Sequence, residues 1–475
     1  MTMKVANPGQ RVSVVSELAR GFRKFRKRWL ARSAEWSIEP VWGQTPEALA
    51  ERAHAFFRAQ EGSDSQSLLG SKIEAVRQFD VAGMERVAAI CRWGSSGSLL
   101  LASYLDGHED VIMLGGNLGT GIYPFFECHR SLSLRDKLLA YPFVSIDGYD
   151  HTQYFFQGNH AVAAADYYAA VNALLEVYGD RPPEFLESRR TFFQFLHIVC
   201  CVASGQRPAG PHPLMVYSQS QANDLFARFL IEDFPQARFI HTVRDPITNV
   251  GRLFEHDLRG LGLLAAVYVI AHLAFGDRAH PGMESRTRAI RFEDLHLHLE
   301  ETMGAVAAWF GIAYRPSLLE STFNGRPFFW KPATGTAWSG ARPEKAARDS
   351  RNVSFTDRYL LFTLFTEDFV AWDYPCPKFF THTLARVLTF TLVVLIPMKM
   401  EFLTARAVFK LFVSGNFRSV FKGLAQICTA RVAIMSLVAA ELYRRLTSGK
   451  RVLELLPLSS RQDANQPMPL EQRIS

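Results

Sequence analysis

The 475-residue sequence has only six cysteines, and none of them forms a Cys-x-x-Cys pair or stands at a zinc-like spacing from histidine. Such scarcity argues against a disulfide-stabilised secreted protein and against a zinc finger. The amino-terminal part also lacks a signal peptide, because the basic stretch Arg20–Arg32 follows its short apolar run in place of a cleavage site. We therefore expect buried thiols, no metal site and a reducing, cytoplasmic compartment.

A long uninterrupted apolar run is missing as well. The most apolar segment, Phe379–Met398, contains His382 and Arg386, which leave Val387–Met398 as its clean part. A helix that spans a bilayer needs about 20 apolar residues, so this segment is better interpreted as interfacial or re-entrant. We expect peripheral or monotopic membrane association, with a single span at 379–398 as the alternative.

A net positive charge is absent from the middle of the chain, although the net charge of the whole chain is +7. Met1–Ala34 has nine Lys or Arg and one acid, Lys378–Arg451 has twelve and two, and Glu35–Pro377 carries a net charge of −10. A chain that is 48% apolar and 21% charged is globular. The acidic middle argues against nucleic acid as a partner, whereas the basic ends are suited to an anionic membrane surface.

Both basic ends show the periodicity of amphipathic helices. Apolar residues recur every three or four positions from Val15 to Trp29, with Lys and Arg between them, and a similar stripe lies within Glu401–Val413. That second stripe consists of Phe402, Ala405, Phe409 and Phe412, beside Arg406 and Lys410. Another helix is expected over Asn416–Arg445. Such helices lie in the headgroup region of a bilayer, and the alternative is that they pack on the protein's own core.

The middle of the chain has the pattern of an α/β domain, in which short apolar runs alternate with helical stretches. Strands are expected at Arg86–Cys91, Leu214–Tyr217, Arg238–Val243 and Arg288–Phe292. We divide the chain into a basic amino-terminal helix at 1–40, an α/β domain at 41–375, a membrane-associated helical segment at 376–455 and a disordered tail at 456–475.

The strongest local motif is a turn of small residues between the first strand and a helix. Its residues are Arg92, Trp93, Gly94, Ser95, Ser96, Gly97 and Ser98. Backbone N–H groups of such a turn and the positive end of the helix that follows bind phosphate or sulfate. The lysine of a Walker A motif is missing, which disfavours a kinase or ATPase. A tight connection without any ligand is the alternative.

Two further segments place charged residues at the carboxyl ends of strands. The strand Arg238–Val243 leads into Arg244-Asp245-Pro246, and Ala289–Phe292 leads into Glu293-Asp294-Leu295 before a helix. Ligands of open α/β sheets bind at the carboxyl edge, and a guanidinium is suited to phosphate because its planar fork is permanently charged.

Together these motifs resemble the sulfotransferase family, especially its bacterial and Golgi-type branch. The resemblance covers about Arg86–Trp330 and includes Leu-Asp-Gly-His-Glu-Asp-Val after the turn helix, Phe-Pro-Gln-Ala-Arg-Phe-Ile-His-Thr-Val-Arg-Asp-Pro at 234–246 and Ile-Arg-Phe-Glu-Asp-Leu at 290–295. It implies an α/β, P-loop-like three-layer fold with a central parallel sheet, to which this chain adds basic amphipathic helices at both ends. It also implies 3′-phosphoadenosine 5′-phosphosulfate (PAPS) as the donor substrate.

Residue roles follow from the resemblance, with departures. Arg244 matches the family's arginine for the 3′-phosphate, and Arg252, with Asn249 nearby, replaces its serine. The family's basic residue in the turn is Ser95 here, so we expect Arg92 to bind the phosphosulfate and to act in catalysis.

The general base is harder to assign, because the positions that match the family's glutamate are Gly115 and Gly116. Glu127 and His129 are the candidates that we prefer. Further candidates are Asp147, Asp150 and His151.

We expect transfer of a sulfuryl group to a hydroxyl or amine of a glycan or lipid-linked acceptor. The alternatives are an inactive sulfotransferase-like scaffold at the membrane and another nucleotide-dependent transferase or kinase.

Overall fold

A computed structural model gives the structure of the chain. It describes residues 45–59, 65–92, 96–114, 121–146, 149–150, 155–156, 161–219, 224–256, 283–329, 339–347, 353–381, 397–447 and 452–459, with the single residues 267, 270, 388 and 392. The helix predicted at 1–40 lies outside the described residues, as do most of the apolar segment 379–398 and residues 460–475 of the predicted tail.

A five-stranded parallel sheet forms the centre of the α/β domain. Its strands are β1 (Val87–Arg92), β2 (Val111–Met113), β5 (Leu214–Gln219), β6 (Arg238–Val243) and β7 (Thr287–Arg291). They are ordered β2-β5-β1-β6-β7, so β1 lies in the middle, with Ile90 opposite Ser218 on one side and Ile240 on the other. All four predicted strands are confirmed. The fifth, β2, has only three residues, too few for an apolar pattern to stand out.

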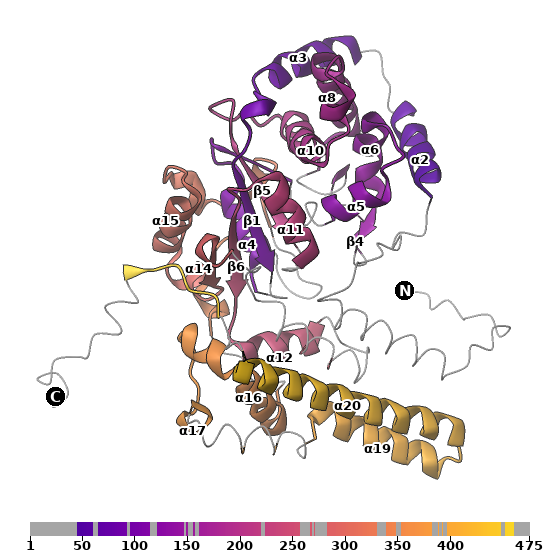
Figure 1. The fold of residues 1–475 in the computed structure, drawn as a ribbon, viewed down its shortest axis with the longest axis vertical. Helices are drawn as coiled ribbons and strands as arrows, with labels where there is room; N and C mark the ends of the chain where they lie inside the picture. The colour runs from indigo at the N-terminus through magenta and orange to yellow at the C-terminus, as the bar shows by residue number, and fades with distance from the viewer. Residues whose placement is uncertain are drawn as a thin grey trace, which may run out of the picture.

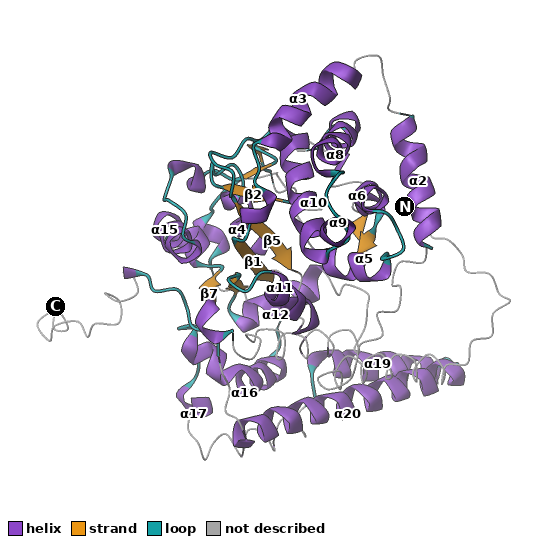
Figure 2. Ribbon diagram, turned by 45° about the horizontal axis from the view of Figure 1, so that its top comes forward, coloured by secondary structure: helices purple, strands orange, loops and turns teal. Residues whose placement is uncertain are grey.

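Helices cover both faces of the sheet (Figures 1 and 2). The helices up to α12 are α2 (Pro46–Arg58), α3 (Ser65–Arg77), α4 (Ser98–Leu105), α5 (Ile122–Cys128), α6 (Leu134–Ala140), α8 (Ala164–Tyr178), α9 (Pro183–Leu186), α10 (Arg189–Ser204), α11 (Asp224–Asp233) and α12 (Pro246–His256). The later helices are α14 (Asp294–Leu297), α15 (Leu299–Phe310), α16 (Phe355–Ala371), α17 (Lys378–Thr381), α19 (Lys399–Val413) and α20 (Phe417–Thr447). Short hairpins pair β3 (Ser145–Ile146) with β4 (Tyr149–Asp150) and β8 (Thr322–Phe323) with β9 (Arg326–Pro327).

Alternation of side chains along the strands creates two apolar cores. Tyr217 belongs to the first core, where its ring lies 5.5 Å from that of Phe193 in α10. Ile90 and Ile240 belong to the second core, with Leu101 of α4 and Val306 of α15. Because neighbouring positions of a parallel strand face opposite sides, both faces need a helical cover. The predicted α/β class with a central parallel sheet in three layers is therefore confirmed.

The carboxyl-terminal part of the chain packs on the edge of the sheet. Residues 452–456 run beside β7, where the N–H of Ala289 donates to the carbonyl of Glu454 (2.7 Å) and the N–H of Leu456 to the carbonyl of Ala289 (2.8 Å). Leu456 and Leu458 are buried. The segment predicted as a disordered tail from residue 456 thus begins with packed residues, which extend at least to Leu458.

Helices α19 and α20 occupy the two stretches for which amphipathic helices are predicted near the carboxyl terminus. Among the helices that can be described, none combines the length and the apolar character needed to cross a bilayer.

Candidate functional site

The turn after β1 holds its shape through a glycine. Gly97 has φ +90°, and a Cβ atom there would lie 2.6 Å from Cδ2 of Phe292, the residue that follows β7. Only glycine adopts this backbone conformation readily and also leaves room for the ring. Arg92 ends β1, and Trp93, Gly94 and Ser95 lie outside the described residues.

Ser96 attaches the same turn to β6. Its hydroxyl lies 2.8 Å from that of Thr242, and both residues are buried. Ser98 then begins α4, whose first hydrogen bond runs from the N–H of Leu101 to the carbonyl of Gly97 (2.9 Å). The first N–H groups of any α-helix have no partner within that helix, and they carry the positive end of its dipole. The turn therefore presents donors at the carboxyl end of β1, as the sequence predicts.

Arg244 leaves the end of β6 and enters the same region. Its side chain is only 5% exposed, and its guanidinium carbon lies 3.9 Å from the centroid of the Phe292 ring. An NH2 group donates to the carbonyl of Lys345 at 3.4 Å. Burial, together with the charge of Arg252, lowers the pKa of Arg244 to about 10, while the charge of Glu293 opposes the change. The guanidinium is still a cation at neutral pH.

Helix α12 carries the two other residues predicted to contact the donor. It starts with a cap in which the N–H of Thr248 donates to Asp245 Oδ1 at 2.8 Å. Asn249 is fully buried within the helix, and Arg252 is partly buried one turn later. The charge of Arg252 contributes to the lowered pKa of Arg244, after burial.

A partly buried carboxylate to which the sequence assigned no role accompanies Arg244. Glu293 accepts a hydrogen bond from the Tyr374 hydroxyl at 2.6 Å, and the N–H of Asp245 donates to its other oxygen at 3.5 Å. Burial raises the pKa of Glu293. Its position directly after β7, in the segment 290–295, was the signal that could have identified it. We infer that Glu293 and Tyr374 hold the start of α12 near Arg244.

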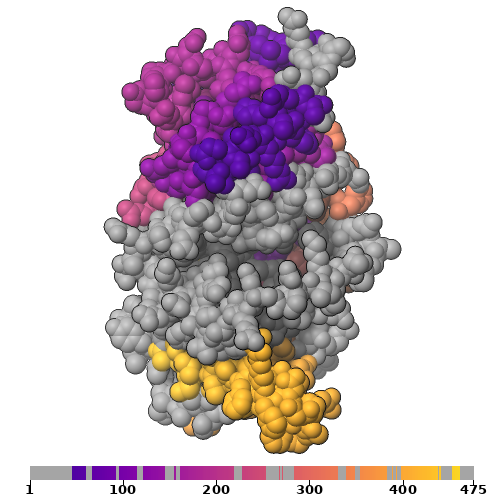
Figure 3. Space-filling view, turned by 90° about the vertical axis from the view of Figure 1, so that its right-hand side faces the viewer, coloured from indigo at the N-terminus to yellow at the C-terminus, as the bar shows by residue number. Residues whose placement is uncertain are grey.

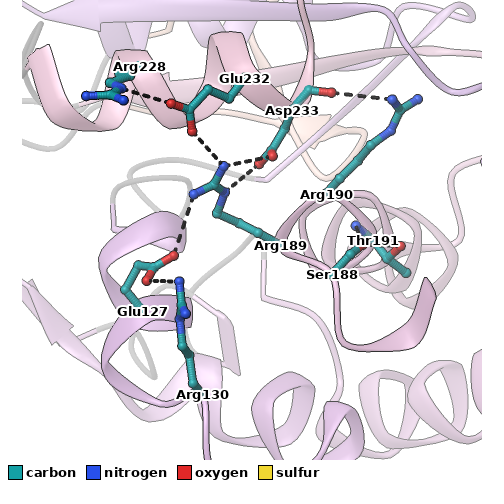
Figure 4. A network of polar contacts seen from close by, with 9 residues as sticks. All are labelled: Glu127, Arg130, Ser188, Arg189, Arg190, Thr191, Arg228, Glu232 and Asp233. Atoms are coloured by element: carbon teal, nitrogen blue, oxygen red, sulfur yellow. Dashed lines mark hydrogen bonds and ion pairs between the residues drawn. The ribbon is translucent and has the colours of Figure 1, made fainter. Parts of the chain in front are cut away.

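Glu127 lies in a network of charged side chains, shown in Figure 4. Its carboxylate is 2.5 Å from Arg130 and 3.6 Å from Arg189, which also binds Asp233 at 2.8 Å. Asp233 ends α11 shortly before β6 begins. The structure therefore links Glu127 of α5 to α10 and α11 through Arg189.

His129 is also in the interior. Its Nδ1 lies 2.9 Å from the carbonyl oxygen of Phe125, and its ring stacks on the Phe125 ring with centroids 4.4 Å apart. Burial lowers its pKa, which favours the neutral imidazole. The catalytic roles of Glu127, His129 and Arg92 stay predictions. Asp147 and His151 lie outside the described residues, and so does the side chain of Asp150.

The site thus combines a helix amino terminus, two hydroxyls and two arginines, all of them groups that bind phosphate or sulfate. Within the described ranges, no group of three or more His, Cys, Asp or Glu side chains could hold a metal ion.

A comparison with models of protein families decides the family. Residues 95–316, just under half of the chain, match the model of the sulfotransferase family. These residues form a sulfotransferase domain. The matched residues include Ser96, Gly97, Arg244 and Glu293, whereas Lys345 and Tyr374, which bond to the last two, lie beyond them. The predicted family is thereby confirmed.

Two solved structures are similar to this sulfotransferase domain at low sequence identity. The sulfotransferase domain from the curacin biosynthetic pathway is 15% identical, and the match covers 62% of this chain and 98% of that one, with a TM-score of 0.32. Sulfotransferase STF9 from Mycobacterium avium is 11% identical over 78% of this chain and 99% of that one, also with a TM-score of 0.32. Likenesses this weak add nothing to the family match. No curated protein matches the chain.

Proposed function

We propose that the sulfotransferase domain transfers a sulfuryl group from PAPS to a hydroxyl or amine of a glycan or lipid-linked acceptor at a membrane surface. The observation that carries the proposal is Arg244, whose guanidinium packs on the same Phe292 ring that lies against Gly97 at the start of α4. The charge of Arg252 in α12 acts on Arg244 as well. The sulfotransferase family supports sulfuryl transfer in general. The donor, the acceptor class and the membrane location belong to the proposal.

The donor fits the charges of the site. Burial, and to a smaller extent the charge of Arg252, makes the charged form of Arg244 less stable, as its lowered pKa indicates. Nε of Arg252 is buried and has no hydrogen-bond partner among the described residues. A phosphate dianion would relieve the repulsion between the two guanidinium groups and would supply the acceptor that Nε lacks. This pair is suited to the 3′-phosphate of PAPS.

The turn after β1 is suited to the other end of the donor. When bound, PAPS supplies the sulfuryl group: the acceptor oxygen or nitrogen bonds to sulfur as the bond from sulfur to the 5′-phosphate breaks, which releases 3′,5′-adenosine bisphosphate and a proton. Ser96, Ser98 and the first N–H groups of α4 would hold the 5′-phosphosulfate, and Arg92 would neutralise charge on the departing phosphate. Glu127 and His129 are the candidates for taking the proton.

The test is calorimetric binding of 3′,5′-adenosine bisphosphate and of adenosine 5′-phosphate to the full chain and to Arg244→Ala. Loss of a charge-assisted contact should weaken binding of the bisphosphate by roughly 10- to 100-fold. Binding of the nucleotide without a 3′-phosphate should change little. Equal losses for both nucleotides would refute the role of Arg244.

Arg228→Ala is the matched control, because this arginine is exposed on α11 and belongs to the network around Glu127. Transfer is tested with labelled PAPS and membrane extracts. Binding of the bisphosphate without any transfer would favour the inactive scaffold, and no binding at all would refute the enzyme.

A further inference from the structure

Helices α19 and α20 form a hairpin that projects from the body of the molecule (Figures 1 and 2). The chain reverses at Ser414, Gly415 and Asn416, where Gly415 has φ +74°. The two helices pack closely, since a Cβ atom on Gly423 would lie 2.2 Å from Cγ2 of Val408. The hairpin therefore consists of two helices that pack closely against each other.

The base of the hairpin is anchored in the protein. Ala430, Ile434 and Val438 of α20 are buried in one apolar cluster with Leu361 and Leu364 of α16. Nε of Arg431 donates to Glu401 at 3.0 Å, and the N–H of Lys399 donates to Asp357 at 3.0 Å. These contacts hold the hairpin in a defined direction relative to the domain.

The outer part of the hairpin exposes a large apolar surface, here called the hairpin tip and defined as residues 402–424. Phe409 is 66% exposed and Phe421 is 72% exposed. The other exposed large apolar residues of the tip are Phe402, Leu403, Phe412, Val413, Phe417 and Leu424. In Figure 3 this end of the hairpin protrudes at the lower end of the molecule. Exposed apolar patches of this kind mark interaction surfaces.

Spacing shows that the α20 side chains share one face. Phe417, Phe421 and Leu424 follow one another at intervals of four and three, and Val432 and Met435 continue the exposed stripe beyond the tip. The stripe predicted on α19 by Phe402, Ala405, Phe409 and Phe412 is likewise exposed, so it does not pack on the protein's own core.

The charge of the hairpin tip has one sign. Arg406, Lys410, Arg418 and Lys422 are exposed beside the apolar residues. The sequence has no Asp or Glu between Phe402 and Met435. The nearest acid, Glu401, is buried and paired with Arg431. A second copy of the same hairpin would bring like charges together, whereas an anionic lipid surface complements both the cations and the apolar rings.

We propose that the hairpin tip docks on the surface of an anionic phospholipid bilayer, with its phenylalanine rings at the acyl boundary and its four cations at the lipid phosphates. This inference specifies the membrane contact of the proposed function, and it does not depend on sulfuryl transfer. Because α12 follows Arg244 and packs on α16, which holds the hairpin, docking would turn the carboxyl end of the sheet toward the bilayer.

The experiment is flotation of the full chain with phosphatidylcholine vesicles that contain or lack phosphatidylglycerol. We expect binding to the anionic vesicles, and loss of binding as salt is raised. Lys410→Gln with Lys422→Gln should weaken binding roughly five-fold per charge removed. Phe409→Ser with Phe421→Ser should weaken it at least as strongly at every salt concentration.

Matched controls come from elsewhere on the surface. Arg77→Gln removes an exposed cation from α3 at the far end of the molecule, and Phe329→Ser removes a phenylalanine that is 53% exposed. Neither control substitution should change vesicle binding.

Equal losses of vesicle binding in controls and tip variants, or no binding to anionic vesicles, would overturn the proposal. So would a lipid-free dimer, measured by sedimentation, that Phe409→Ser with Phe421→Ser dissociates, because the tip would then be an interface between copies.

Discussion

Individual residues in the site are constrained by close packing more than by their chemistry. Gly97 shows this directly, because its positive φ and its contact with Phe292 both require the absence of a side chain. The guanidinium carbon of Arg244 in turn lies 3.9 Å from the centroid of the Phe292 ring. One ring therefore couples the turn after β1 to the arginine after β6.

Gly97→Ala should destabilise the fold by more than the cost of the backbone conformation alone, which is about 1–2 kcal/mol. Its Cβ would force the Phe292 ring to move, and binding of 3′,5′-adenosine bisphosphate should weaken as well. Urea unfolding and calorimetry measure the two effects.

Gly205→Ala is the control for this substitution. Gly205 has φ +80°, close to that of Gly97, but a Cβ there would meet nothing within 4 Å. This variant should show the backbone cost without the loss of binding. If the two variants behaved alike, the contact with Phe292 would have no part in shaping the site.

At the scale of elements, the packed part of the C-terminal tail completes the sheet. Residues 452–456 cover the edge strand β7, which would otherwise present unpaired N–H and C=O groups. Trp372 adds a further tie, since its indole N–H donates to the carbonyl of Leu453 at 3.1 Å. This segment follows α20 in the sequence, so it connects the hairpin of α19 and α20 to the edge of the sheet.

A chain that ends at Lys450 should be markedly less stable than the full chain. It loses the two hydrogen bonds to Ala289 and the buried side chains of Leu453, Leu456 and Leu458. Each buried leucine alone contributes about 2–5 kcal/mol in substitutions to alanine. A chain that ends at Ser459 keeps all of these contacts, and its urea midpoint should equal that of the full chain. Equal midpoints for both truncations would contradict the stabilising role of the segment.

At the scale of the whole molecule, buried histidines connect stability to pH. Burial lowers the pKa of His241 in β6 to about 3 and that of His197 in α10 to about 4. Near pH 7 both are neutral in the folded and the unfolded chain. In the unfolded chain the pKa of histidine is 6.5. As the pH falls below this pKa, the unfolded chain takes up protons that the folded chain does not bind, so the free energy of unfolding decreases.

Between the two pKa values each histidine should lower the free energy of unfolding by about 1.4 kcal/mol for every unit that the pH falls. We expect His241→Gln to reduce this slope, whatever its effect on stability at neutral pH. The measurement is urea unfolding at several pH values from 6.5 down to about 4. His298→Gln, at an exposed position, is the control, and an unchanged slope in His241→Gln would contradict the assignment.

The α/β class, four of the five strands and the turn of small residues between β1 and α4 can be read from the amino-acid sequence, because local apolar patterns and strand-to-helix turns depend on neighbouring residues. Only the tertiary structure decided which distant groups meet. Phe292 contacts Arg244 and Tyr374 contacts Glu293 from separate segments, and Glu127 is paired with Arg189. The stripe on α19 shows the same division. Its periodicity predicts an apolar face, but whether that face packs inside or lies exposed depends on how the hairpin joins the rest of the chain.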